Sequence, residues 1–253
     1  MHSRFLTATI IILLTGSLTG LQADDLATQW LGWIDNVESV DHMEGVVKTT
    51  ITTSSGAERT LTAKMWSAQG GDVSLMAYTD PPRVAGDKIL QRDNGDNIWY
   101  YMKRRDVTRH FSGHTRRQKA MGSDFSYEDM ASGDLKEDYT AEFIGEEMTQ
   151  KTKCAKLKLK PTESGPSYDH LILWVALEDT LTRQIEYYDK NGLLKTLTLS
   201  DIKLIDGKKI PCKMLMDNQA ENSRTLMEYE SISFKVNPPE WYFGQDALTR
   251  DIR

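Results

Sequence analysis

The feature that most constrains the fold is an alternation of apolar and polar residues, which runs through most of the chain after residue 45. In KCAKLKLK (153–160), Leu157 and Leu159 point to one face of an extended strand, and the lysines between them point to the other. Alternation of this kind predicts strands that are buried on one face only. Such strands belong to an antiparallel sheet with one solvated face and one covered face.

Turn signals divide this region into about eleven to thirteen strands. The strongest signals are DNGD at 93–96, NG at 191–192 and DG at 206–207, and their spacing is typical of an antiparallel meander. A meander this long curls, so its inner face forms either a packed core or an apolar cavity. Both interpretations stay open, although eleven methionines favour a cavity because methionine adapts to variable shapes.

The first 23 residues have the organisation of a cleavable signal peptide. A short basic start precedes an apolar run over residues 5–14, and small residues then lead to a cleavage point after Ala23. The apolar run is about half of the ~20 residues needed to span a bilayer, although an uncleaved anchor is the alternative. Leu21 stands where lipid attachment would need a cysteine, so we expect an exported protein without a lipid anchor. Residues 24–253 contain no repeat or linker, which predicts a single domain.

Residues 24–39 are predicted to form an amphipathic helix before the first strand. Asp24 and Asp25 suit its N-terminus, where the helix dipole favours negative charge. Helical spacing places a group of large apolar side chains on one face, which would have to cover an apolar surface. These residues are Leu26, Trp30, Trp33, Ile34 and Val37.

Residues 103–119 are unusually basic for a chain with a net charge of −6. They contain seven lysines and arginines against the single acid Asp106. One interpretation is a solvated loop that pairs with the acids after it. The other is a docking patch for anionic lipid headgroups or an acidic partner. The residues predicted for docking are Arg104, Arg105, Arg109, Arg116 and Arg117. Because the chain as a whole has a negative net charge, we do not expect nucleic acid as a partner.

The stretch MGSDFSYEDM (121–130) crowds three carboxylates, Asp124, Glu128 and Asp129, into six residues. Paired carboxylates can perform acid–base chemistry. No nucleophile motif or phosphate loop accompanies them, and the nearby histidines lack the spacing of a zinc site. We therefore predict no enzyme, metal or cofactor, and we expect Ser126 and Asp129 to cap a short helix or turn. Pairing of Cys154 with Cys212 stays open, because export favours a disulfide and a simple meander opposes it.

Several stretches together resemble the bacterial outer-membrane lipoprotein-sorting proteins, relatives of the periplasmic carrier LolA. They are DPPRVAGDKIL, NIWYYMKRRDVTR, GSDFSYEDM, EYYDKNGLLKTLTLSD and NPPEWYFG, and they span nearly all of the chain after the signal peptide. The most specific is GSDFSYEDM. Its signature residues are Gly122, Ser123, Asp124, Phe125, Tyr127, Glu128 and Asp129.

The resemblance implies a mainly β (α+β) fold, an incomplete antiparallel β-barrel of about 11 strands with helices covering its concave apolar face. It also implies a soluble periplasmic carrier that shelters the acyl chains of a lipoprotein or another hydrophobic cargo. Such a carrier would receive cargo from an inner-membrane transporter and deliver it to an outer-membrane acceptor, with transient contact to membrane surfaces. The basic run and MGSDFSYEDM depart from LolA itself, so the cargo stays open.

A second hypothesis is a lipid-sensing or accessory subunit of an efflux-type exporter, for which the basic run would be the docking surface. In either role the cargo would contact apolar side chains that point inward. The residues expected to line the cavity are Trp30, Trp33, Ile34, Leu61, Met65, Leu75, Met76, Ile98, Tyr100, Ile172, Trp174 and Ile185.

Overall fold

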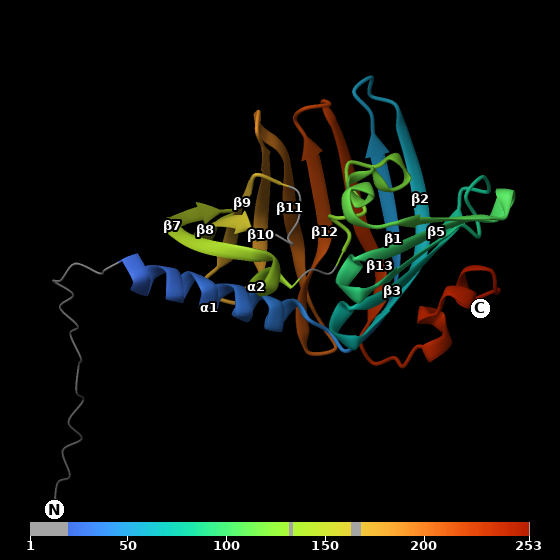
Figure 1. Ribbon diagram of the computed structural model, residues 1–253, viewed down its shortest axis with the longest axis horizontal. Coiled ribbons are helices and arrows are strands. Elements are labelled where there is room, and N and C mark those ends of the chain that lie inside the picture. The colour runs from blue at the N-terminus through green and yellow to red at the C-terminus, as the bar shows by residue number, and fades with distance from the viewer. Residues whose placement is uncertain (1–19, 132–133, 163–167, 253) are drawn as a thin grey trace, which may run out of the picture.

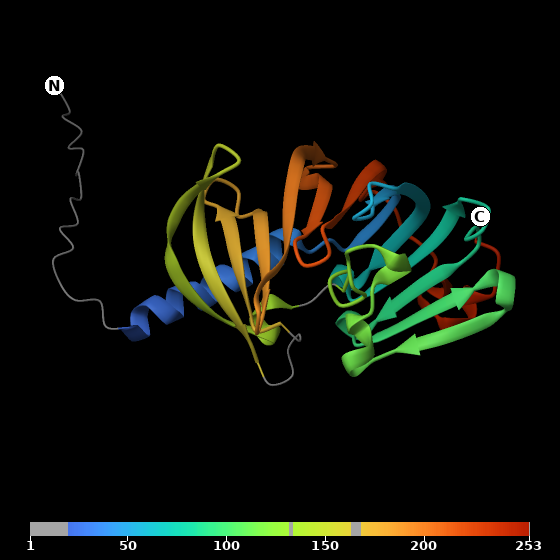
Figure 2. The same ribbon diagram turned by 90° about the horizontal axis from the view of Figure 1, so that it is seen from above.

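The computed structural model describes residues 20–131, 134–162 and 168–252. Residues 1–19 of the predicted signal peptide lie outside the described residues. Thirteen strands form one antiparallel sheet that curves into an open trough (Figures 1 and 2). The prediction of an incomplete antiparallel barrel is confirmed, and its thirteen strands fall within the eleven to thirteen that the turn signals predict.

The strands follow one another along the chain, and most are joined by short turns, the long connection from β6 to β7 excepted. They are β1 (His42–Thr52), β2 (Glu58–Ala68), β3 (Val73–Asp80), β4 (Lys88–Arg92), β5 (Asn97–Met102), β6 (Val107–Phe111), β7 (Tyr139–Thr149), β8 (Thr152–Pro161), β9 (His170–Ala176), β10 (Thr182–Asp189), β11 (Gly192–Ile205), β12 (Lys208–Asn218) and β13 (Ser223–Ser233). The predicted turn at 93–96 joins β4 to β5, where Arg92 pairs with Asn97.

The strand order determines the path of the chain through the trough. β1 lies in the middle of the sheet beside β13, and successive hairpins lead from β1 out to β6 at one edge. The chain then crosses to β7 at the opposite edge and returns by hairpins to β13. The connection between β6 and β7 must therefore pass from one edge of the open sheet to the other.

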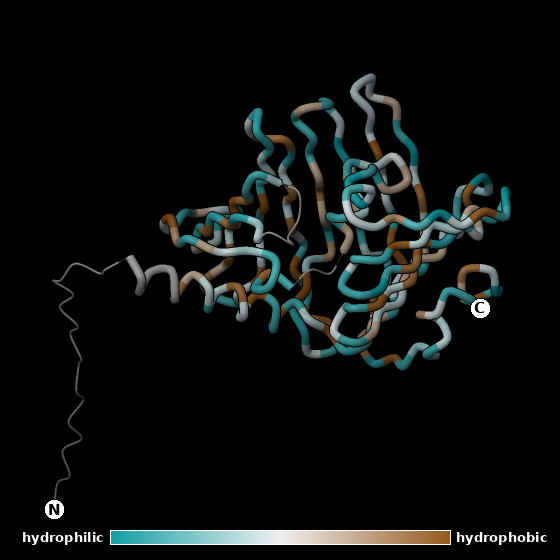
Figure 3. The backbone as a smooth tube through the Cα atoms, in the orientation of Figure 1, coloured by the Kyte–Doolittle hydropathy of each residue, from teal (hydrophilic) through white to brown (hydrophobic). Residues whose placement is uncertain are grey.

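The two faces of the sheet bury different sets of side chains, as the alternation predicts. Hydrophobic and hydrophilic residues are interspersed along the strands (Figure 3). We call the face that carries the largest apolar cluster the inner face. Its strand residues include Val47, Ile51, Leu61, Met76, Ile98, Leu157, Leu173, Leu197 and Met216. On the outer face, a smaller cluster around Trp66, Leu75 and Leu90 is covered by the C-terminal 3-10 helices η6 (Glu240–Phe243) and η7 (Gln245–Leu248).

Helix α1 (Gly20–Glu38) packs on the inner face near β7 and contacts the short helix α2 (Leu135–Asp138). It begins before the predicted start at residue 24. The side chains it buries are Ala27, Leu31 and Ile34. None of the helices in the described ranges has both the length and the apolar character needed to cross a bilayer.

The two cysteines do not form a disulfide. Cys154 lies on β8 and Cys212 on β12, four positions apart in the sheet order. Both thiols are buried, and burial raises the pKa of each above its usual range. The meander topology therefore keeps the two cysteines on separate strands.

We expect Leu157→Ala to lower the free energy of unfolding by about 2–5 kcal/mol, because it removes a fully buried side chain from the inner cluster. Leu204→Ala is the matched control, since Leu204 is 70% exposed, and it should change the free energy by no more than about 0.5 kcal/mol. Chemical denaturation of both variants measures the difference. Equal effects would contradict the assignment of the inner face.

Candidate functional site

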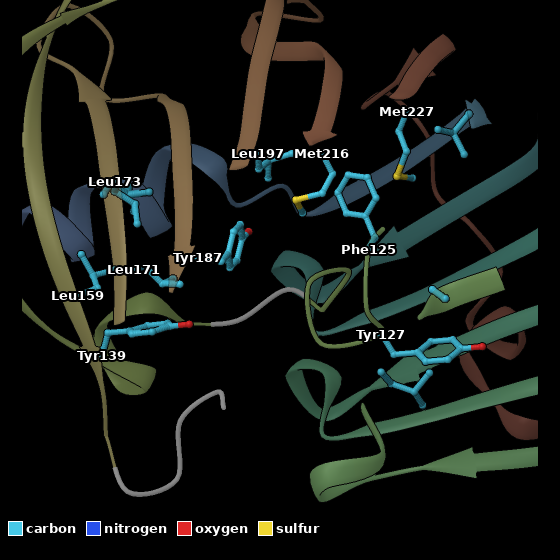
Figure 4. Packing of buried hydrophobic residues seen from close by; sticks show 14 of the residues in the cluster. Phe125, Tyr127, Tyr139, Leu159, Leu171, Leu173, Tyr187, Leu197, Met216 and Met227 are labelled. Carbon is cyan, nitrogen blue, oxygen red and sulfur yellow. The ribbon is translucent and has the colours of Figure 1, made fainter. Parts of the chain in front are cut away.

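The candidate site is the inner face of the sheet together with the loop that fills it. We call residues 118–131 the inner segment; they belong to the connection between β6 and β7 and include the MGSDFSYEDM stretch. Figure 4 shows Phe125 pointing toward Met216 and Met227 on the sheet. Tyr127 stacks on Phe111 of β6, with ring centroids 4.4 Å apart. The inner segment is therefore part of the main apolar cluster.

Local hydrogen bonds explain why the inner segment folds as it does. Ser126 N donates to Asp129 Oδ2 (2.6 Å), and Asp129 N donates to Ser126 Oγ (3.1 Å). This is the reciprocal capping that the sequence predicts, although it closes a turn and starts no helix. Gly122 has φ +68° and packs against Arg59, so a Cβ there would lie 2.5 Å from the guanidinium.

Asp124 anchors the inner segment to β12 and β13 through neutral donors. Its carboxylate is almost fully buried and accepts hydrogen bonds from Ser223 Oγ (2.6 Å), Thr225 Oγ1 (2.8 Å) and Asn218 Nδ2 (3.2 Å). Lys119 Nζ lies 3.4 Å from the same carboxylate. With its oxygens engaged in this way, Asp124 serves as an anchor and is poorly placed to transfer protons to a ligand.

Asp129 anchors the inner segment to β11 through a charge. Its carboxylate is fully buried and forms an ion pair with the buried ammonium of Lys195. Tyr168, just before β9, donates its hydroxyl to the other carboxylate oxygen at 2.6 Å. Burial, reinforced by the Asp129 charge, raises the pKa of Tyr168 well above its usual value, so its hydroxyl stays protonated and can donate.

Two histidines on the strands have structural partners. His110 stacks on Trp99 and His170 stacks on Tyr188, each with a polar partner. Among the described residues, no group of three or more His, Cys, Asp or Glu side chains is arranged to hold a metal ion. What the inner face offers is a large apolar surface with two buried polar anchors.

Three comparisons with known proteins bear on this arrangement. A family model described as an uncharacterized protein matches residues 70–250, which is more than half of the chain. The chain belongs to that family. No curated protein matches the sequence.

Solved structures share the fold over nearly their whole length. A protein of the DUF1329 family from Desulfovibrio piger is 24% identical, with a TM-score of 0.83, and the match covers 89% of this chain and 99% of that one. An outer membrane lipoprotein-sorting protein domain from Vibrio parahaemolyticus is 21% identical (TM-score 0.82; 90% and 100% covered). A LolA superfamily protein from Nitrosomonas europaea is 20% identical (TM-score 0.73; 87% and 98% covered). The LolA-like fold implied by the resemblance is confirmed.

Within this family fold, most of the residues expected to line the cavity do lie together on the inner face. Ile34, Leu61, Met76 and Ile98 are buried in the main cluster, and Trp30, Met65, Tyr100 and Ile185 pack against it half-buried. Their contact with cargo stays a prediction.

Four of the expected lining residues do not point inward. Leu75, Ile172 and Trp174 lie on the outer face, because their neighbours of opposite parity, such as Met76 and Leu173, take the inner positions. Trp33 is 46% exposed and meets Trp30 edge-on, since the buried stripe of α1 is rotated from the one expected. Strands that are apolar on both faces show no alternation, so their sequence does not indicate which residues point inward.

The basic run surrounds the free edge strand β6. Arg104 and Arg105 lie in the turn before β6, Arg109 lies on it, and Arg117 follows it; all four are exposed. Arg116 differs, because it donates to Gly95 O (2.9 Å) and pairs with Asp96 (3.0 Å), with a side chain only 14% exposed. It holds the β4–β5 turn and is unsuited to docking.

The acids of the inner segment do not balance the basic run as a group. Lys119 reaches Asp124, but Asp129 takes its counterion from Lys195, which lies 66 residues further along the chain. Lys195 was missed by the sequence analysis, although the signal is present. In LLKTLTLSD, Lys195 has the same parity as Leu197 and Leu199, which makes it a lysine at an apolar position of the alternation.

We expect Lys195→Met to lower the free energy of unfolding by about 3–5 kcal/mol, because it leaves the Asp129 carboxylate buried and unpaired. Combining it with Asp129→Asn should restore most of that loss, since neither charge of the pair remains. Lys213→Met, which breaks a partly exposed pair with Glu228, should cost no more than about 1 kcal/mol. Equal stability of the single and double variants in chemical denaturation would contradict the buried pair.

We also expect a pH effect from Asp35 on α1, which accepts hydrogen bonds from the backbone N–H groups of Leu135 and Lys136. Burial raises the pKa of Asp35 to about 6, although these hydrogen bonds oppose the rise. The folded state therefore retains a proton that the unfolded state has lost, and stability falls as pH rises from about 4 to about 6. Asp35→Asn should flatten this decline, whereas Asp41→Asn, at an exposed position, should leave it unchanged. Parallel pH profiles for wild type and Asp35→Asn would refute the assignment.

Proposed function

We propose that this protein is a periplasmic carrier that shelters the acyl chain of a lipoprotein or lipid on its inner face. The observation that carries the proposal is the apolar cluster of an open LolA-like sheet, which is covered by α1 and by the inner segment. No pair of strands has to separate for a ligand to reach this face. Displacing a loop or a helix is enough.

The energetics of an acyl chain support a binding role without catalysis. A chain of about sixteen carbons gains roughly 0.8 kcal/mol for each buried methylene, or about 12 kcal/mol in a membrane. A carrier must supply apolar surface of comparable extent. The buried carboxylates of the inner segment are engaged as anchors, which fits a carrier better than an enzyme.

The first test is to purify the protein from its native periplasm under mild conditions and to identify co-purifying molecules by mass spectrometry. The proposal expects acyl lipid or acylated protein in stoichiometric amounts. A protein that carries no such molecule and also fails to bind an apolar dye would overturn it.

We further propose that the exposed cations around β6 dock the carrier on its donor, its acceptor or an anionic membrane surface. Arg104, Arg105 and Arg109 lie together at a free sheet edge in a chain whose net charge is −6. An inner-membrane transporter as donor and an outer-membrane protein as acceptor fit the resemblance to lipoprotein-sorting proteins.

Reversing Arg104, Arg105 and Arg109 to glutamate should weaken binding to anionic vesicles at least about tenfold at low salt and leave acyl-ligand affinity nearly unchanged. Reversal of Lys151, Lys160 and Lys190, which are exposed on the other half of the sheet, is the matched control. Vesicle co-sedimentation and dye displacement measure the two properties separately. Equal losses in both assays, or an equal effect of the control, would rule out a dedicated docking patch.

A further inference from the structure

The ammonium of Lys195 occupies an unusual place on the inner face. Lys195 pairs with Tyr187 on β10 and with Asn218 on β12, so its side chain lies in an inward-facing row across neighbouring strands. The residue is 5% exposed. Its ammonium lies 5.4 Å from the ring centre of Tyr168 and 5.2 Å from that of Tyr187. The Lys195 ammonium is therefore a buried cation among apolar side chains, on the face that would contact cargo in our proposal.

The inner segment supplies the counterion for this cation. The Asp129 carboxylate is held by the Lys195 ammonium and the Tyr168 hydroxyl from the body of the protein, and by a backbone N–H of its own segment. An ammonium and a phenol hydroxyl that converge on one carboxylate form the kind of site that binds the anionic headgroup of a ligand. In this structure the carboxylate of Asp129, a residue of the protein itself, occupies that site.

Displacement of the inner segment by cargo would therefore have different consequences at its two anchors. At Asp124, the sheet would be left with the neutral side chains of Ser223, Thr225 and Asn218, besides a partly exposed lysine. At Asp129, it would be left with a buried ammonium that has lost its counterion, which is a large penalty. A ligand that brings its own anion removes this penalty, and a neutral ligand does not.

We propose that the inner face selects acyl amphiphiles with an anionic headgroup, a carboxylate or a phosphate, which replaces Asp129 against Lys195 and Tyr168. This inference rests on the proposed carrier function and adds the class of cargo. The acyl chain would take the positions that Phe125 and Tyr127 now occupy, while the headgroup would lie at β11.

The test compares ligands of equal chain length by displacement of an apolar fluorophore at pH 8. Hexadecanoate and hexadecyl phosphate carry an anion, and hexadecanol does not. Wild type should bind at least one of the anionic ligands about tenfold or more tightly than hexadecanol, as expected for a charge-assisted contact. The stronger of the two anionic ligands identifies carboxylate or phosphate as the preferred headgroup.

Two variants assign the preference to this pair. Asp129→Asn/Lys195→Met removes both charges, leaves no unpaired acid and should abolish the preference. Asp129→Asn alone removes the internal competitor and should strengthen binding of the anionic ligand. Lys213→Met, which removes a surface lysine from neighbouring β12, should behave as wild type.

The possible results separate the inference from the carrier proposal. Equal binding of all three ligands by wild type overturns the headgroup site and leaves the carrier proposal standing. Retention of the preference in the double variant also overturns the site. Failure of wild type to bind any of the ligands overturns both proposals.

Discussion

The rest of this structure depends on one topological constraint, the crossing of the chain from β6 at one edge of an open sheet to β7 at the other. Because neighbouring strands are paired, the connection cannot pass through the sheet and has to run over a face or around the strand ends. It passes over the inner face, where residues 118–131 fill part of the trough. The same constraint thus gives the sheet a cover, and this cover lies where our proposal places the ligand.

The contacts of this loop combine two physical requirements. Its apolar residues, Phe125 and Tyr127 foremost, complete a core that a single curved sheet cannot close. Its buried carboxylates need compensation, and the sheet provides hydroxyl and amide groups for Asp124 and an ammonium for Asp129. Buried polar contacts of this kind fix one arrangement of the loop. In our proposal, an anionic ligand can replace the loop carboxylate in its contact with the ammonium.

Much of the fold can be predicted from the sequence, and the features that were not predicted have physical explanations. The period of two in segments such as KCAKLKLK, with the turn at 93–96, predicted the strands and hairpins. The shared parity of Leu157 and Leu159 predicted that both side chains lie on one covered face. Face assignment failed at Leu75, Ile172 and Trp174, where both faces are apolar and a shift of one residue exchanges them. The Asp129–Lys195 pair joins segments 66 residues apart, and only the strand order brings them together.

In our proposal the inner segment occupies the ligand site and leaves it when an acyl chain binds. Amide hydrogen exchange over residues 118–131, measured with and without saturating hexadecanoate, reports this displacement. We expect faster exchange of the Asp124 amide, whose hydrogen bond to Thr225 Oγ1 (2.9 Å) joins the inner segment to β13, with unchanged exchange in the backbone of the central strands β1 and β13. Unchanged or slower exchange of the Asp124 amide in a demonstrably loaded protein would contradict the displacement.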